Sequence, residues 1–116
     1  MALRAQELGS FSTATTTAAP SSDTDGFACY GARYINAWCQ TAGGAGAMWQ
    51  TYIYLYRTGI GWVYYRDVPQ QIALYSSTNG GLIEFEVRGA ERIYFRVFFV
   101  ESAPTANVLL EGFTYR

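Results

Sequence analysis

The sequence predicts an all-β protein, an antiparallel β-sandwich of jelly-roll type with an extended N-terminal arm. Short segments rich in aromatic and β-branched residues alternate between apolar and polar positions, and residues typical of turns separate them. No segment has the periodicity of an amphipathic helix. The 116 residues leave room for one core. We therefore divide the chain into an N-terminal arm or edge strand, residues 1–25, and a sandwich domain, residues 26–116.

The N-terminal segment differs in composition from the rest of the chain. Residues 10–25 (SFSTATTTAAPSSDTD) are mostly Ser, Thr, Ala and Asp, with Pro20 among them. This composition permits a β-strand around residues 11–17. It equally permits an extended arm that becomes ordered only against a neighbouring subunit. Both interpretations are compatible with the sequence.

The first strand of the domain is predicted at residues 34–41 (YINAWCQT), and a glycine-rich run at residues 43–46 ends it. That run lacks the lysine of a phosphate-binding loop and opens no helix, so it does not indicate nucleotide binding. We expect a flexible loop there instead.

The clearest local signal is a β-hairpin. Residues 49–57 (WQTYIYLYR) and 61–67 (GWVYYRD) flank a short connection that contains Gly59, as a hairpin turn requires. A turn centred on Gly59 predicts three facing pairs on one side of the hairpin: Tyr56 with Trp62, Tyr54 with Tyr64, and Tyr52 with Arg66. The other side is predicted to face the core and carries Ile53, Leu55, Val63 and Tyr65.

The second half of the domain continues the alternation. After a break at Pro69, the predicted elements are a short stretch at residues 71–75, a turn at 78–81, a strand at 82–88, a turn at 89–91, a strand at 92–101, a loop at 102–107 and a closing strand at 108–115. The residues predicted to point inward are Ile83, Phe85, Val87, Ile93, Phe95, Val97 and Phe99. Glu84 and Glu86 then point outward.

Composition argues against several classes of protein. A formal net charge of −1 does not provide the basic stripe of a nucleic-acid-binding protein. No apolar run approaches the roughly 20 residues that span a bilayer, and no signal peptide is recognisable.

We expect assembly in a cytoplasm, with Cys29 and Cys39 reduced and buried. Two cysteines without histidine make a poor zinc site, and Asp23 and Asp25 form no calcium loop.

The sequence offers few groups for catalysis. It contains neither histidine nor lysine, so the commonest general base and the amine nucleophile are absent. Glu84 and Glu86 lie on one strand face, roughly 7 Å apart by strand geometry, but outward-pointing glutamates usually solvate a strand. Arg88, Arg92 and Arg96 are near enough in sequence to pair with them. We predict no enzymatic activity, no catalytic residue, no cofactor and no metal.

The aromatic side of the hairpin is the predicted interaction face, made of Tyr52, Tyr54, Tyr56, Trp62, Tyr64 and Arg66. Tyrosine, tryptophan and arginine are enriched at the centres of protein interfaces, and aromatic platforms also stack on sugar rings. Alternatively, a second layer of the same domain covers these side chains, and the face is not available to a partner. All three interpretations are compatible with the sequence.

A strand, a glycine-rich loop and the aromatic hairpin are followed by V-x-G-A-x-x-I-x-F-x-V at residues 87–97 and by VLLEGF at residues 108–113. In this order of segments, residues 27–116 resemble small β-sandwich proteins of tailed-phage virions. These are jelly-roll capsid decoration or cement proteins and sandwich modules of tail and fibre proteins. The resemblance implies symmetric oligomers seated on a capsid lattice, with an N-terminal arm in inter-subunit contacts. It assigns no function to individual residues.

The predicted function is therefore that of a non-enzymatic virion structural protein, a capsid decoration or cement protein that stabilises the shell through inter-subunit contacts. We expect it in the virion, as a homo-oligomer, with the major capsid protein or other virion subunits as partners. One alternative is a carbohydrate-binding module or lectin-like adhesin that holds a glycan on the aromatic face. A further alternative is a tail or head–tail connector component.

Overall fold

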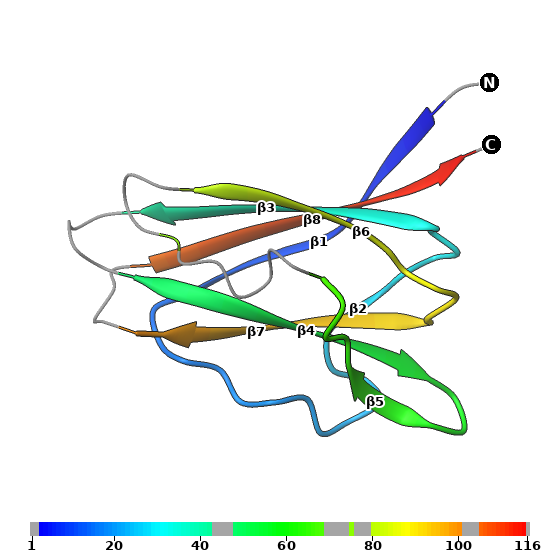
Figure 1. Cartoon of the computed structure of the whole chain (residues 1–116), viewed down its shortest axis with the longest axis horizontal. Coiled ribbons are helices and arrows are strands. Elements are labelled where there is room, and N and C mark those ends of the chain that lie inside the picture. The colour runs from blue at the N-terminus through cyan, green and yellow to red at the C-terminus, as the bar shows by residue number, and fades with distance from the viewer. Residues whose placement is uncertain (1–2, 43–47, 69–74, 76–79, 101–104, 116) are drawn as a thin grey trace.

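Apolar side chains at every second strand position join two antiparallel four-stranded sheets face to face in this computed structural model (Figure 1). The structure describes residues 3–42, 48–68, 75, 80–100 and 105–115. The strands are β1 (Leu3–Thr13), β2 (Phe27–Ala28), β3 (Tyr34–Ala42), β4 (Trp49–Arg57), β5 (Gly61–Tyr64), β6 (Gly81–Glu86), β7 (Arg92–Phe99) and β8 (Thr105–Tyr115). Within this part of the chain, no helix is long and apolar enough to cross a membrane. The all-β prediction is confirmed.

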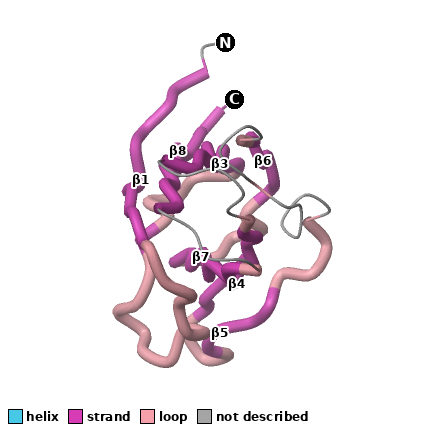
Figure 2. The backbone as a smooth tube through the Cα atoms, turned by 90° about the vertical axis from the view of Figure 1, so that its left-hand side faces the viewer, coloured by secondary structure: helices cyan, strands magenta, loops and turns pink. Residues whose placement is uncertain are grey.

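The two sheets form separate layers (Figure 2). The first sheet has the strand order β1-β8-β3-β6, and the second has the order β2-β7-β4-β5. The core lies between them, and its completely buried aliphatic residues are Ile35, Ala37, Ile53, Ile83, Val87, Ile93, Val97, Ala106 and Leu110. The predicted inward residues of β6 and β7 are buried, Phe99 only in part, while Glu84 and Glu86 are exposed, so these orientations are confirmed.

One end of the core is closed by Trp49, which has no exposed surface. Its ring packs 4.9 Å from the ring of Tyr75, centroid to centroid, and its Nε1–H donates a hydrogen bond to Thr41 Oγ1. Because Trp49 belongs to β4 and Thr41 to β3, this hydrogen bond joins the two sheets. Tyr75 also hydrogen-bonds the buried Cys39 thiol.

Several predicted boundaries differ from the structure. The β4–β5 hairpin has the predicted register, with Tyr54 opposite Tyr64 and Tyr56 opposite Trp62, but β5 ends at Tyr64 and not at residue 67. The loop predicted at residues 102–107 extends too far, because β8 already begins at Thr105. The predictions for residues 43–46, 71–74, 78–79 and 101–104 lie outside the described residues.

The prediction that Val63 faces the core is wrong, since half of its surface, 50%, is exposed. The cause is the position of β5 at the edge of the second sheet, where Figure 1 shows it displaced from the first sheet. Strand alternation gives the correct face for Val63, but no opposing sheet covers that face.

Most of the N-terminal segment forms an edge strand and a connection. β1 pairs along its length with β8 and forms one edge of the first sheet, so the edge-strand interpretation describes residues 3–13. Residues 14–26, which we call the strap, then cross from the first sheet to the second and lead into β2 (Figure 1, Figure 2).

The strap satisfies the edge of β7 that the two-residue β2 leaves unpaired. The backbone N–H of Thr17 donates to the carbonyl of Val97, and the backbone N–H of Val97 donates to Thr17 Oγ1. The backbone N–H of Phe99 donates to Thr16 Oγ1. Unpaired N–H groups on a sheet edge favour pairing with other chains, and these contacts remove two of them.

Arg92 of β7 fixes the end of the strap. Its guanidinium donates three hydrogen bonds, to the carbonyls of Thr24, Asp25 and Gly26, at 2.9 to 3.1 Å. Gly26 has a φ of +70°, and a Cβ there would lie 2.2 Å from the carbonyl oxygen of Ile93, so only glycine fits. The strap therefore lies directly on the backbone of β7.

We expect Arg92→Ala to destabilise the fold by about 2–3 kcal/mol, because it removes three hydrogen bonds from a charged donor to backbone carbonyls. Arg66→Ala is the matched control: Arg66 is exposed, and its loss should cost roughly 0.5 kcal/mol or less. Urea unfolding measures both. Equal stabilities of the two variants would contradict the role given to Arg92.

Cys29 and Cys39 are free and buried, and burial raises the pKa of Cys29 to about 11 and that of Cys39 to about 12. Both thiols are therefore neutral at pH 8, and we expect neither to react with an aromatic disulfide reagent in the folded protein. In denaturant both should react within minutes. The thiol pKa values are higher in the folded protein than their ordinary value of 9.0, so the unfolded chain loses these protons at lower pH. The free energy of unfolding should therefore fall as pH rises above 9.0. Rapid labelling of the folded protein would show that the core opens at these residues.

Candidate functional site

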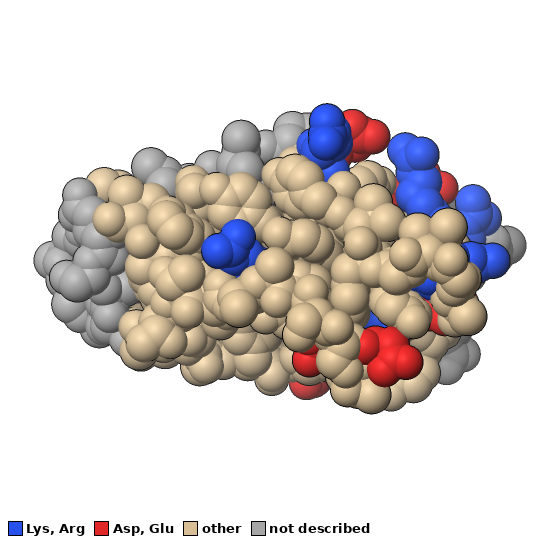
Figure 3. All heavy atoms as spheres, turned by 90° about the horizontal axis from the view of Figure 1, so that it is seen from below, with Lys and Arg blue, Asp and Glu red and all other residues tan. Residues whose placement is uncertain are grey.

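The predicted interaction face lies on the outer side of the second sheet. Tyr52, Tyr54 and Tyr56 project from β4, and Trp62 and Tyr64 project from β5 beside them. Figure 3 shows this side of the molecule: among the described residues, charged side chains gather toward one end, and a broad surface of other side chains with one basic patch lies beside them.

The rings of this face pack on one another. Ring centroids are 5.6 Å apart for Tyr54 and Tyr64, 5.2 Å for Tyr56 and Trp62, and 6.0 Å for Tyr52 and Tyr64, all in tilted geometry. Aromatic pairs in such geometry each contribute about 0.5–1.5 kcal/mol beyond the area that they bury. The face is consequently a connected cluster of rings.

Residues of β7 that the sequence analysis did not assign complete the cluster. Tyr94 lies opposite Tyr54, and its ring contacts the rings of both Tyr54 and Trp62. Arg96 lies opposite Tyr52 with its guanidinium carbon 5.9 Å from the ring centroid, a cation–π contact. Alternation along β7 predicts that Tyr94 and Arg96 point outward, away from the core. Only the pairing of β7 with β4 brings them beside the tyrosines of this face.

Arg66, predicted to face Tyr52, follows the end of β5 and is exposed. Burial, together with the neighbouring Tyr52 and Tyr54, raises the pKa of the Tyr64 phenol above its ordinary value, and the positive charge of Arg66 opposes this rise. Arg66 therefore lies at the border of the cluster.

The strap covers one part of the aromatic cluster. The Trp62 Nε1–H donates a hydrogen bond of 2.8 Å to the carbonyl of Ser22, and the Tyr94 hydroxyl donates one of 2.8 Å to the carbonyl of Ala18. The rings of β4 and Trp62 are half-buried, and Tyr64 is exposed to 36%. The face is thus partly covered by its own chain, as the alternative in the sequence analysis allowed, and partly open.

Three hydroxyl groups of the cluster have no partner in the part of the chain that the structure describes. Those of Tyr54, Tyr56 and Tyr64 make no hydrogen bond within the described residues. The Tyr52 hydroxyl, in contrast, accepts a hydrogen bond of 2.7 Å from Gln50 Nε2. The open part therefore offers apolar ring surface together with donors and acceptors, which is the chemistry of a contact surface.

The acidic residues considered for chemistry have structural roles. The Asp25 carboxylate accepts hydrogen bonds from the backbone N–H groups of Ser21 and Ser22, which lower its pKa below 3.8. Glu86 lies 3.7 Å from Arg88 in an exposed ion pair. Of the three arginines near enough in sequence to pair with the glutamates, Arg88 does so, whereas Arg92 and Arg96 reach strap carbonyls. Among the described residues, no three acidic or cysteine side chains are grouped to hold a metal.

No family model matches this chain, and neither a curated protein nor a solved structure matches it.

The Trp62 hydrogen bond to the strap provides a test of how the face is covered. Trp62→Phe keeps a ring but loses the N–H, so we expect faster amide exchange in residues 18–24 and a loss of about 1 kcal/mol in stability. Tyr64→Phe is the control, since it removes a hydroxyl that makes no hydrogen bond within the described part. Unchanged exchange in Trp62→Phe would show that the strap is held without this bond.

Proposed function

We propose that this protein is a non-enzymatic structural protein of a virion, a capsid decoration or cement protein that stabilises the shell through contacts between subunits. The observation that carries the proposal is the half-buried aromatic cluster, in which the hydroxyls of Tyr54, Tyr56 and Tyr64 make no hydrogen bond to any part of the chain that the structure describes. Rigid aromatic side chains lose little conformational freedom on binding, which favours their use in interfaces.

The strand order supports the jelly-roll type. An eight-stranded jelly roll folds two Greek keys into two sheets of four strands. In such a fold the first strand pairs with the last and the second with the next to last. Both pairings are present here, β1 with β8 and β2 with β7, in different sheets. The third and sixth strands complete one sheet, and the fourth and fifth complete the other.

The N-terminal segment contributes an exposed sheet edge to the proposed contacts. β1 lies at the edge of the first sheet and is eleven residues long. A long edge strand is a template for pairing with a strand of another chain. Within residues 1–25, we assign β1 this role in contacts with other virion subunits, among them the major capsid protein or further copies of this chain.

Quantitative mass spectrometry of purified particles tests the location and the copy number of the protein. Hundreds of copies per particle would support the decoration role. A handful of copies would move the protein to the tail or to the head–tail connector, and its absence from particles would overturn the virion proposal.

The contact itself is tested with Tyr64→Ser, which we expect to weaken attachment to particles by about tenfold or more, because an exposed aromatic side chain leaves the interface. Val63→Ser is a matched control, as this neighbour is also exposed but points to the opposite side of the same strand. Co-sedimentation with particles that lack the protein measures both. Equal attachment of the two variants would place the contact elsewhere.

A further inference from the structure

The outer side of the first sheet carries a second surface, separate from the predicted interaction face. Strand register arranges its side chains in three rows across β1, β8 and β3. The middle row is Ser10, Leu109 and Trp38, and the rows that flank it are Ser12, Asn107 and Gln40 on one side and Glu7, Glu111 and Asn36 on the other. Leu109 and the Trp38 indole thus lie side by side between two polar rows, with Ser10 at the end of their own row.

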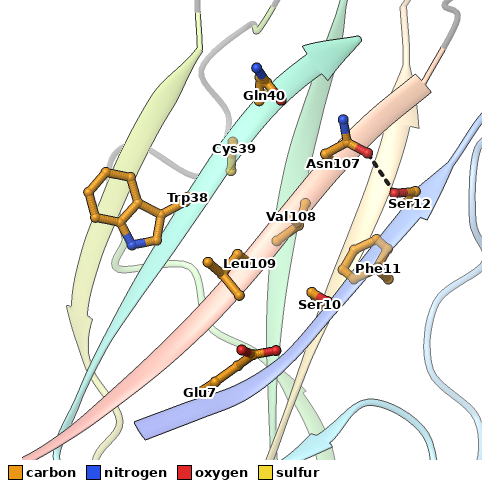
Figure 4. Close-up of a pocket in the computed structure, with 10 residues that line it drawn as sticks. All are labelled: Glu7, Ser10, Phe11, Ser12, Trp38, Cys39, Gln40, Asn107, Val108 and Leu109. Atoms are coloured by element: carbon orange, nitrogen blue, oxygen red, sulfur yellow. Dashed lines mark hydrogen bonds between the residues drawn. The ribbon is translucent and has the colours of Figure 1, made fainter. Parts of the chain in front are cut away.

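The middle row, together with Glu7, Ser12, Asn107 and Gln40 of the flanking rows, lines a shallow hollow of about 580 Å³ (Figure 4). Leu109 lies in its middle, Trp38 lies at one side, and Ser10 and Ser12 of β1 lie at the other. Binding sites for small ligands have volumes of about 300–1,000 Å³. The hollow is therefore large enough for a small ring and its substituents.

Trp38 is exposed to 47%, and its indole is nevertheless held in place. Its Nε1–H donates a hydrogen bond of 2.8 Å to Glu111 Oε1, on the neighbouring strand β8. Figure 4 shows the indole lying flat on the sheet with its broad face outward. Because the polar edge of the ring is already bonded, the surface that remains for a partner is apolar and planar.

The polar side chains of the hollow supply both donors and acceptors. Asn107 Oδ1 accepts a hydrogen bond of 2.6 Å from the Ser12 hydroxyl, which leaves the amide N–H groups of Asn107 free to donate. The side chains of Gln40 and Glu7 make no hydrogen bond within the described residues. Paired donors and acceptors beside a flat apolar surface are suited to a ligand with many hydroxyls on an apolar ring.

We propose that this hollow binds a neutral sugar ring, stacked on Trp38 and hydrogen-bonded by Gln40, Asn107 and Glu7. The apolar C–H face of a pyranose packs on an indole, while its hydroxyls each donate and accept hydrogen bonds. Charge selects the class of sugar. Among the described residues that line the hollow, Glu7 is charged and none is an arginine, so phosphorylated, sulfated and uronic acid ligands are disfavoured. This site lies on the opposite sheet from the aromatic cluster and does not depend on the virion proposal.

Isothermal titration of the full chain tests the proposal with four neutral tetrasaccharides, built from glucose, mannose, galactose or N-acetylglucosamine, and with tetragalacturonate as an anionic comparison. We expect at least one neutral sugar to bind and tetragalacturonate to bind more weakly. Trp38→Ala should weaken the binding about tenfold and Gln40→Ala about fivefold. Tyr64→Ser, on the other sheet, should leave it unchanged.

Trp38 and Gln40 are exposed, so both variants should keep the fold, and circular dichroism verifies this. Tryptophan fluorescence gives an independent readout, because a sugar that quenches emission in the parent protein should not do so in Trp38→Phe. Four results would overturn the proposal: no binding of any neutral sugar at millimolar concentration, binding that Trp38→Ala leaves intact, binding that Tyr64→Ser abolishes, or tighter binding of tetragalacturonate. If Trp38→Ala weakens attachment to particles and no sugar binds, the hollow is a protein contact and the sugar site is rejected.

Discussion

Face-to-face burial of two apolar sheet surfaces is the interaction on which the rest of this protein depends. Inward side chains such as Ile35, Ile53 and Ile93 have no exposed surface, and each such side chain contributes about 1.5–3 kcal/mol when fully buried. Strand alternation assigns every second residue to this task and leaves the others outside. The outward residues can therefore vary in chemistry without loss of the core, and the two outer faces of this sandwich do differ.

The strap connects the core to one of these faces. It carries the chain between the two sheets, satisfies the edge of β7 beyond β2, and bonds to Arg92, Trp62 and Tyr94 on the outer side of the second sheet. A polar segment that satisfies its hydrogen bonds in this way needs no core of its own. The same segment determines which aromatic rings stay open, because it covers the part of the cluster next to Tyr94.

The two outer faces are suited to different partners. The second sheet presents tyrosines, tryptophan and arginines packed on one another, a chemistry that fits a protein surface. The first sheet presents one indole, amides and carboxylates around a hollow, a chemistry that fits hydroxyl-rich ligands. Because the two faces lie on opposite sides of the sandwich (Figure 2), the proposed shell contact on one would leave the proposed sugar site on the other accessible.

The sequence alone determined the all-β class, the β4–β5 hairpin with its two aromatic pairs, and the inward residues of β6 and β7, since each follows from alternation and turn chemistry within a few neighbouring residues. Tertiary structure decided which strands share a sheet, and hence that Tyr94 and Arg96 join the aromatic cluster and that Trp38 lies beside Leu109. It also decided that Val63 is exposed and that the strap covers Trp62. These facts depend on contacts between residues far apart in the chain, which no local pattern encodes.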